Sequence, residues 1–468
     1  MISPPIAGPQ VNAVEVTGSH AWKADVLTLF QQLLPAVFFC EALRQARVRQ
    51  NNCIYTNAVV IWLMIAQRLQ GGTLETAVLE LLRGLPATFW PQPCKRLQRS
   101  AGPEGPKLSS NTGAFNQARQ ELLVSLVEQA YDRVFGQLSE RMTGVIPEVG
   151  ERVFFVDGTA VRLAHREKLR QMYPPAPNQH GESHWPLIRM LVVHDLYTGL
   201  ALRPVWGPMH GNDPVSEQGL LERLIDRLPA LSVLLGDSNF GVFSVAYAAD
   251  QRSHPVVLRL TVARAQHLYG GPLRDGIDQR IQWKPSRDDR KSHPGLPAEA
   301  SVSGRLIVRE VQPSNGAPAF LLAVFTTLEI EAEAVIQLYG NRWNIEVDLR
   351  SLKDTLLLDQ LTCTTPEMVA KEMDLAMMAY NLVRAVTYQA AQQAGLPPRA
   401  FSFTRVRNVL NAFLPGIAAA QNEQQAQQRF EDMMYYVRQA RLPKRTRQRR
   451  SYPRAAWPKP KSFPSRHG

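Results

Sequence analysis

Apolar residues recur at helical spacing through the first 145 residues of the chain, which predicts a helical region. Helices are expected at 22–45, 56–70, 74–83 and 112–140. Gly71 and Gly72, followed by Thr73, stop one helix and start the next. The resulting helix–turn–helix either enters a DNA major groove or simply packs against its neighbours. Arg119, on the last of these helices, either contacts DNA or is an ordinary exposed residue.

From residue 152 the pattern changes to short apolar runs that end at polar turns, which is typical of strands. Strands are expected at 152–159, 187–196, 201–208, 231–240 and 256–262, with helices at 216–228 and 242–251. This order indicates an α/β sheet that carries an antiparallel hairpin at one edge.

Residues 263–330 interrupt the order with Gly, Pro and many charged residues. Strands are expected there at 279–284, 305–311 and 319–328, so this stretch is interpreted as a β-rich insertion. Helices are expected again at 331–361, 368–394 and 405–414.

The helix expected at 331–361 has an unusual distribution of polar residues. At about 100° per residue, Tyr339, Arg342, Glu346 and Lys353 fall on one arc about 60° wide. A separate apolar stripe is expected to face a core. The pattern alone also fits a solvated face on which Glu346 pairs with its neighbours four residues away.

Charge points to a polyanionic partner. The chain has 468 residues and a formal net charge of +12, which favours nucleic acid over a membrane surface. Eleven Lys or Arg and no acid lie between residues 438 and 466, among them Arg445, Arg447, Arg449 and Arg450. Such a tail is expected to contact phosphates without regard to sequence, although it could also serve only to solubilise the chain.

Other features narrow the class of protein. The four cysteines form no CxxC pair, so neither a zinc site nor a disulfide framework is indicated. The N-terminus lacks a basic start followed by an apolar run, and the longest apolar run, 58–66, is too short to span a bilayer. A cytoplasmic protein without a membrane partner is expected.

Two expected strands carry an aspartate near their ends, Asp157 in VDGT and Asp237 in LGDS. Each alone is a common turn residue. Together with Glu346 they could converge at the sheet edge, where three hard oxygen ligands suit Mg²⁺ or Mn²⁺. Two such ions can clamp the entering and leaving oxygens of a phosphoryl transfer.

At these residues the chain resembles the DDE transposases of the IS4 group. The signature of that group is Tyr, two residues, Arg, three residues, Glu, six residues and Lys, and it stands here as Tyr339, Arg342, Glu346 and Lys353. The DGT at 157–159 and the GDSNF at 236–240 are similar to the group's two aspartate segments. NQARQEL at 116–122 and YNLVRA at 380–385 look like further family segments. The resemblance covers roughly residues 50–410.

The resemblance implies an α/β RNase H-like catalytic core with a β-rich insertion and helical regions at both ends. The expected division is a DNA-binding region at 1–146, the core at 147–262 and 331–400, the insertion at 263–330, and a C-terminal helical region with the basic tail at 401–468.

The resemblance also implies residue roles. Asp157, Asp237 and Glu346 would hold two Mg²⁺ or Mn²⁺ ions. Tyr339, Arg342 and Lys353 would contact the terminal phosphates and nucleotide. The neighbouring Trp343 would either contact an unstacked base or pack into a core.

The implied activity is DNA transposition. The chain would bind the terminal inverted repeats of an insertion sequence, cleave the phosphodiesters at its ends and join the 3′-OH ends to target DNA. Its expected partners are double-stranded DNA and a second copy in a synaptic complex on the bacterial nucleoid. Two alternatives stay open: a nuclease without strand transfer, and a catalytically silent DNA-binding relative that acts as an inhibitor or domesticated regulator. The presence of all three acids argues against the second.

Overall fold

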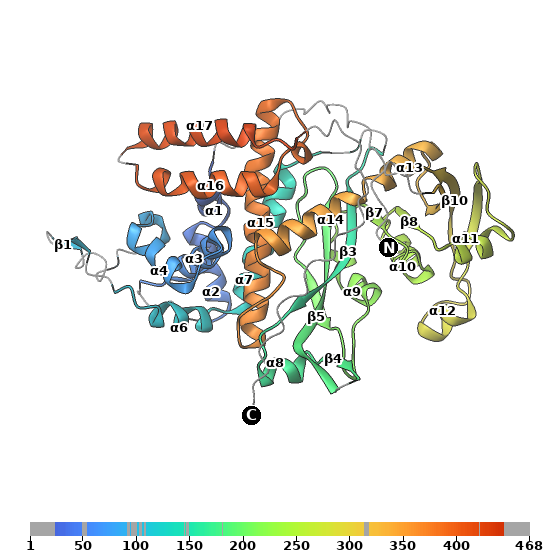
Figure 1. The fold of residues 1–468 in the computed structure, drawn as a ribbon, viewed down its shortest axis with the longest axis horizontal. Coiled ribbons are helices and arrows are strands. Elements are labelled where there is room, and N and C mark those ends of the chain that lie inside the picture. Colours follow the sequence, from blue (N-terminus) through green and yellow to red (C-terminus); the bar gives the residue numbers. More distant parts are fainter. Residues whose placement is uncertain are drawn as a thin grey trace.

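A computed structural model describes residues 24–48, 54–90, 94, 101–102, 105–106, 109–144, 146, 149–179, 181–312, 318–420 and 422–443. Only the backbone is described at Ala87, 101–102, 105–106 and Trp343. The long helix α15 (Pro366–Ala394) stands between a group of N-terminal helices and a large mixed sheet (Figure 1).

In the described part of the chain, the sheet has nine strands in the order β4-β5-β3-β7-β8-β11-β10-β9, and β6 also pairs with β5. The pairs β3–β7 and β7–β8 are parallel, and the other pairs are antiparallel. The strands are β3 (Val153–Arg162), β4 (Pro175–Asn178), β5 (Gly181–Asp195), β6 (Val205–Pro208), β7 (Val233–Gly236), β8 (Val256–Arg259), β9 (Asp278–Trp283), β10 (Val302–Val311) and β11 (Phe320–Thr326). The α/β sheet with a hairpin edge is therefore present, because β5 and β6 form that hairpin.

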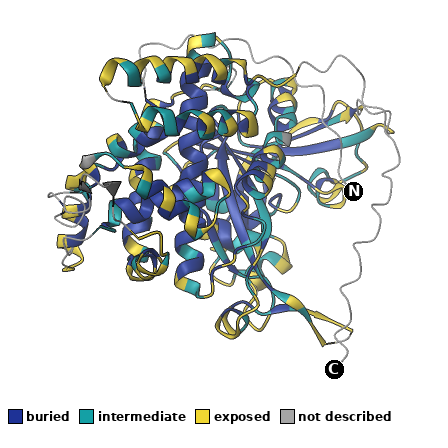
Figure 2. Cartoon of the chain, turned by 60° about the vertical axis from the view of Figure 1, so that its left-hand side comes forward, coloured by how far each residue is buried: buried dark blue, intermediate teal, exposed yellow. Residues whose placement is uncertain are grey.

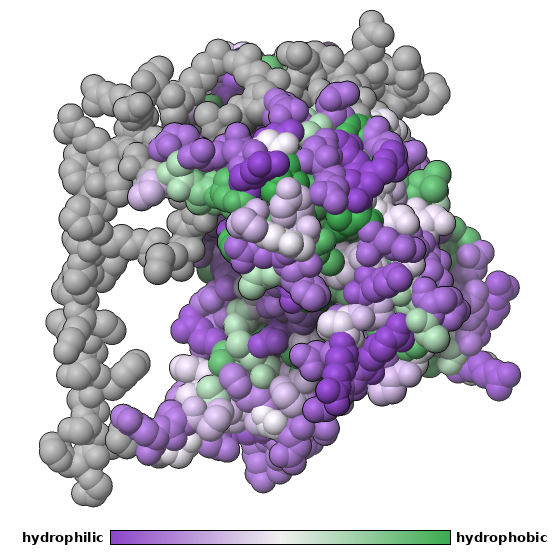
Figure 3. Space-filling model, turned by 90° about the vertical axis from the view of Figure 1, so that its right-hand side faces the viewer, coloured by the Kyte–Doolittle hydropathy of each residue, from purple (hydrophilic) through white to green (hydrophobic). Residues whose placement is uncertain are grey.

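The three strands of the expected insertion extend this central sheet. Strand β11 pairs antiparallel with β8, through Phe325 and Leu258, and β10 and β9 continue outward. Between β8 and β11 lie the short helices α11 (Val262–Tyr269) and α12 (Arg287–Ser292). The surface on this side is mostly hydrophilic (Figure 3).

The N-terminal region is helical, as expected, but two of the long helices are divided. Pro35 separates α1 from α2, because proline lacks the amide proton that would continue the first helix. A break at Leu122 and Leu123 likewise separates α6 from α7. The helices are α1 (Val26–Leu33), α2 (Ala36–Gln45), α3 (Asn57–Gln70), α4 (Leu74–Arg83), η1 (Ala87–Phe89), α6 (Gly113–Glu121) and α7 (Val124–Arg141). Strands β1 (Ala101–Gly102) and β2 (Gly105–Pro106) form a separate pair.

The prediction of a single long helix at 331–361 is wrong. The chain forms α13 (Ala332–Gly340), then α14 (Trp343–Arg350), and then a π-helical turn, Ser351–Thr355. At the junction, the amides of Asn341 and Arg342 bond to carbonyls only three residues back. Gly340 and Asn341 are poor helix formers, which permits a break there. Amphipathic periodicity continues across it because both helices cover the same sheet.

Helix α15 is buried along almost its whole length (Figure 2). It packs against α3 and α7 on one side and against α16 (Phe403–Ala418) and α17 (Glu423–Gln439) on another. Because it is surrounded in this way, its buried polar residues, such as Glu372 and Arg384, need partners on neighbouring elements. The N-terminal and C-terminal helices thus share one hydrophobic core.

The two faces of the sheet belong to different cores. Helices α9 (Glu217–Leu224) and α10 (Phe243–Asp250) cover one face, and α13 and α14 cover the other. No single helix in the described part of the chain is long and apolar enough to cross a membrane. The pair α1 and α2 passes that test together by length and composition, but it is bent by 44°.

Candidate active site

The sheet brings Asp157 and Asp237 together. Phe155 of β3 is the parallel register partner of Leu235 of β7. Asp157 lies two residues further along β3, and Asp237 lies two residues after Leu235, directly beyond the end of β7. Residues two apart point to the same face. Phe155 and Leu235 both belong to the core under α13 and α14, so the two carboxylates emerge on that face.

The charge of Asp237 affects the protonation of Asp157. Burial, and then the negative charge of Asp237, raise the pKa of Asp157 to about 7. The Gly158 amide, which donates to Asp157 Oδ1 at 2.8 Å, and the guanidinium of Arg342 act in the opposite direction. A second negative charge is therefore costly here unless a cation lies close.

Arg342 connects the aspartates with Glu346. Its Nη2 lies 3.3 Å from Glu346 Oε1. Burial lowers the pKa of Arg342, but the charges of Tyr339, Asp157, Asp237 and Glu346 outweigh burial and raise it. One guanidinium is thus within electrostatic reach of all three predicted acids.

Tyr339, another residue of the signature, lies close enough to this guanidinium to raise its pKa. Tyr339, in the last turn of α13, has a buried ring, and burial raises its pKa against the charges of Arg342 and Arg259. Lys353 lies in the π-helical turn and is partly exposed. Trp343 is the first residue of α14.

The donor chemistry fits a divalent cation only in part. Two half-buried carboxylates that repel each other are suitable hard ligands. Glu346, however, pairs with Arg342, and the described residues contain no group of three or more His, Cys, Asp or Glu spaced to hold a metal ion. Glu346 would complete the ligand set only if its carboxylate turned away from Arg342.

Sequence reasoning missed Glu217 and Asn239. Glu217 opens α9 on the opposite face of the sheet, and its side chain lies over Gly158: a Cβ there would be 2.2 Å from Glu217 Cδ. The Asn239 side chain donates to Glu217, and its backbone amide donates to Asp237 Oδ1 at 2.8 Å. The sequence signal that could have indicated a close neighbour here is Gly158, the glycine directly after Asp157.

The structure contradicts DNA contact by Arg119. Its side chain is buried, with 6% of the residue's surface exposed, and its Nη2 lies 2.6 Å from Glu372 of α15. Arg68 of α3 pairs with the same carboxylate at 2.6 Å. Arg119 therefore joins the N-terminal helices to α15. Arg445, Arg447, Arg449 and Arg450 lie outside the described residues, and their contact with DNA stays a prediction.

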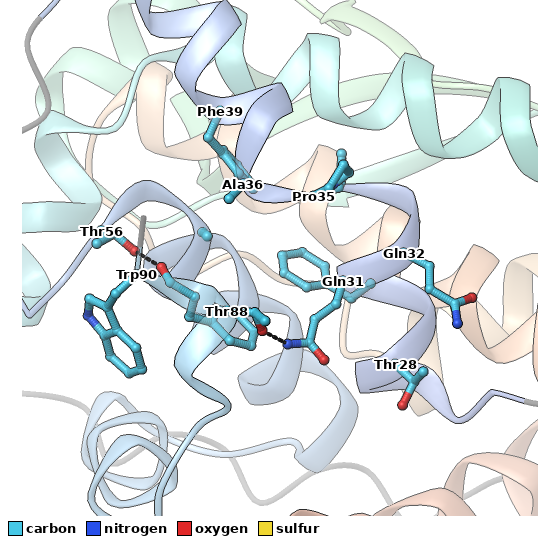
Figure 4. Close-up of a pocket in the computed structure, with 13 residues that line it drawn as sticks. Thr28, Gln31, Gln32, Pro35, Ala36, Phe39, Thr56, Thr88 and Trp90 are labelled. Carbon is cyan, nitrogen blue, oxygen red and sulfur yellow. Dashed lines mark hydrogen bonds between the residues drawn. The ribbon is translucent and has the colours of Figure 1, made fainter. Parts of the chain in front are cut away.

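A cavity of about 450 Å³ lies elsewhere, among the N-terminal helices (Figure 4). Its lining residues all lie between Thr28 and Trp90, and most are apolar. Thr56 donates to the Phe89 carbonyl and Gln31 to Thr88 across its wall. This cavity is a feature of the helical region and contains no described member of the acidic site.

A mixed sheet that presents two aspartates to a helix bearing Arg and Glu is the kind of site expected of a metal-dependent phosphoryl-transfer enzyme. Residues 148–382, half of the chain, match the family model described as Transposase DDE domain, and the chain belongs to that family. The chain is 24% identical, over 362 residues, to the transposase InsG for insertion sequence element IS4 of Escherichia coli (strain K12). That match covers 75% of this chain and 78% of InsG. The resemblance to the IS4 group is thereby confirmed.

Among solved structures, the chain is similar to a cryo-EM structure of a piggyBac transposase synaptic complex with hairpin DNA. The TM-score is 0.44 at 10% sequence identity, with 92% of this chain and 88% of that chain covered.

Proposed function

We propose that this chain is a DNA transposase that cleaves the phosphodiesters at the ends of an insertion sequence and joins the freed 3′-OH ends to target DNA. The observation that carries this proposal is the position of Arg342, within electrostatic reach of Asp157, Asp237 and Glu346. Membership of the DDE transposase family supports the same reaction class.

We further propose an RNase H-like catalytic core. The strand order β6-β5-β3-β7-β8, with antiparallel pairs followed by parallel ones and with α9 and α10 as connections, supports it. The core would comprise 147–262 and 331–400. The insertion at 263–330, the DNA-binding region at 1–146 and the C-terminal region at 401–468 complete the proposed division.

Asp157, Asp237 and Glu346 would hold two Mg²⁺ or Mn²⁺ ions. Bound there, such ions would supply Lewis-acid activation of the scissile phosphate and of the attacking water. The chain's own residues position the DNA. Arg342 would release its ion pair with Glu346 and bind a terminal phosphate instead, since the two parallel N–H groups of a guanidinium suit phosphate oxygens. Lys353 would add a second positive charge, Tyr339 would contact the same terminal nucleotide, and Trp343 an unstacked base.

The proposed partner is double-stranded DNA, both the element's ends and the target. The basic tail with Arg445, Arg447, Arg449 and Arg450 would add contacts to phosphates regardless of sequence. Because two ends must be cut and joined, we propose that two copies assemble on DNA.

The test uses the native ends that flank the gene, placed on a plasmid, and purified full-length protein with Mg²⁺ or Mn²⁺. Wild type is expected to cut at the ends and to yield strand-transfer products. Glu346→Gln should bind the ends and leave them uncut, because it removes a metal ligand. Glu333→Gln, on the exposed face of α13, is the matched control and should cut as wild type does.

The two alternatives give different results in this assay. Cutting without strand-transfer products would identify a nuclease. Binding without any cutting by wild type would identify a catalytically silent relative and would overturn the proposal.

A further inference from the structure

We propose that Asp348 is a positioning residue for this site: a buried ion cluster around its carboxylate sets the place of α14, and with it Glu346 and Arg342. The proposal rests on the function proposed above. It is carried by the geometry around Asp348, which has no role in the metal site itself.

The Asp348 carboxylate is fully buried and held from several directions. Arg399 Nη1 lies 2.7 Å from Oδ1 and 2.6 Å from Oδ2, and the guanidinium of Arg384 donates to Oδ1 as well. His194, also fully buried, places its Nδ1 3.6 Å from Oδ2. Two guanidinium groups on one buried carboxylate fix its place in direction as well as in distance.

The partners of Asp348 belong to parts of the fold that are themselves fixed. Arg399, in the short helix η4 (Pro398–Ala400), also donates to the carbonyls of Asp195 at 2.8 Å and Leu196 at 3.0 Å, where strand β5 ends. Arg384, in the buried helix α15, donates to the Tyr380 hydroxyl at 2.9 Å. The cluster therefore ties α14 to the sheet and to α15 at once.

The position of helix α14 depends on such directional contacts. It has eight residues and lies between the break at Asn341 and the π-helical turn at 351–355. A helix this short is not stable by itself and takes its position from tertiary contacts. Ile345 supplies one buried apolar contact, but apolar contacts are non-directional. The paired hydrogen bonds to Asp348 are directional, so they fix both the rotation of α14 about its axis and its position along that axis.

Asp348 and Glu346 lie on opposite sides of this helix. Two residues correspond to about 200° of helical rotation, so the buried anchor and the acid that faces the aspartates move as one body. Any rotation of α14 that releases Asp348 also shifts Glu346 and Arg342 relative to Asp157 and Asp237. A displacement of about 1 Å in an active site can cost on the order of 100-fold in rate.

The chain offers a matched control. Glu372 is also a buried carboxylate between two arginines, Arg68 and Arg119, each at 2.6 Å. That cluster joins α15 to α3 and α6 and includes no residue of α14. Loss of the charge at Glu372 should destabilise the fold in the same way as loss of the charge at Asp348, but it leaves the anchor of α14 in place.

The experiment compares Asp348→Asn with Glu372→Gln in the full-length protein. Thermal unfolding, binding to the element's ends and cleavage in Mg²⁺ are measured for both, at a temperature where both are folded. Fe²⁺ with ascorbate and peroxide is then used as a probe, because iron in the metal site cuts the nearby backbone. Asp348→Asn should bind DNA but cleave on the order of 100-fold more slowly than Glu372→Gln. Its iron-induced cuts in 343–350 should disappear, while those near Asp157 and Asp237 remain.

Equal cleavage rates and equal cutting patterns in the two variants would overturn the proposal. If Asp348→Asn does not fold, Arg399→Lys replaces it, since lysine keeps the charge but cannot bridge both carboxylate oxygens and two carbonyls. Amide hydrogen exchange tests this proposal independently of the proposed function. Faster exchange of 343–350 in Asp348→Asn, with no change in Glu372→Gln, would support the role of Asp348 in positioning α14. This holds even if wild type neither cuts DNA nor binds iron. Unchanged exchange in that case would overturn it.

Discussion

At the scale of single residues, Gly158 is the position in the candidate site with the least room. It lies between Asp157 on one face of the sheet and the Glu217 side chain on the other. Glu217 in turn accepts from Asn239, which bonds through its backbone to Asp237. Glu217 thus contacts the backbone beside Asp157 and, through Asn239, is connected to Asp237. This arrangement requires that residue 158 has no side chain.

Gly158→Ala tests this arrangement. The new Cβ would lie 2.2 Å from Glu217 Cδ, so either β3 or the Glu217 side chain must move. Because the clash falls on the end of a half-buried side chain, stability should fall by only about 1 kcal/mol in denaturant unfolding. Cleavage of the ends should fall by on the order of 100-fold, with binding retained.

The control is Gly136→Ala within α7, where an added Cβ meets nothing within 4 Å. It should raise stability by about 0.5–1 kcal/mol, because alanine favours a helix over glycine. If Gly158→Ala cleaves the ends at the wild-type rate, Glu217 has no influence on the aspartates.

Asp374 gives a prediction for pH dependence. Burial, followed by smaller effects that include the negative charges of Glu128 and Asp132, raises the pKa of Asp374 to about 8, although Arg203 opposes the shift. In the unfolded chain an aspartate has a pKa of about 3.9. Its protonated form therefore favours folding fully below about pH 4, and this contribution is lost as the pH rises toward 8.

Asp374→Asn should remove this dependence. Relative to wild type, the variant should gain on the order of 1 kcal/mol of unfolding free energy per pH unit between pH 5 and 7. Denaturant unfolding at several pH values measures the difference. Parallel curves for the two proteins would mean that Asp374 does not titrate in this range.

At the scale of elements, the helices that carry the site are held by buried ion pairs as well as by apolar faces. Asp348 joins α14 to α15, and Glu372 joins α15 to α3 and α6. Periodicity locates such helices well, because an apolar stripe has to face a core. It does not show which polar residue on the stripe's border pairs with a distant helix, so the sequence alone leaves Arg119 among the candidates for DNA contact.

Arg119→Ala tests that correction. Loss of Arg119 removes one of the two cationic partners of Glu372 but leaves Arg68 in place, so stability should fall by about 1.5–3 kcal/mol. DNA binding by the folded fraction should be unchanged. Denaturant unfolding and titration with labelled ends measure the two effects. Weaker DNA binding at unchanged stability would instead support a role for Arg119 at the DNA.

At the scale of the whole molecule, positive charge is concentrated at the C-terminal end of the sequence. Nine Lys or Arg and no acid lie in residues 444–468. Truncation after Pro443 should weaken DNA binding and reduce its salt dependence, by about 0.9 in the slope of log K against log salt for each phosphate that the tail neutralises. Titrations with specific and random DNA at several salt concentrations measure this. An unchanged slope would show that the tail does not bind phosphates.

From the sequence alone, the three acids could be predicted as a site, and most of the strands and helices could be located. Asp157, Asp237 and the Tyr339–Lys353 signature could be found because their spacing and local pattern are linear features. The positions of most strands followed from short apolar runs, and the helical N-terminal region followed from its periodicity.

How these parts meet could be read only from the folded chain. The break after Gly340 and the π-helical turn depend on how the helix fits the sheet, and local propensity only permits them. The alignment of β9, β10 and β11 with the central sheet, the close approach of Glu217 to Gly158, and the pairing of Asp348 and Glu372 with distant arginines all join residues far apart in the chain. Backbone hydrogen bonds between strands and buried charges both need partners that no local pattern specifies, so these features appear only when the chain is folded.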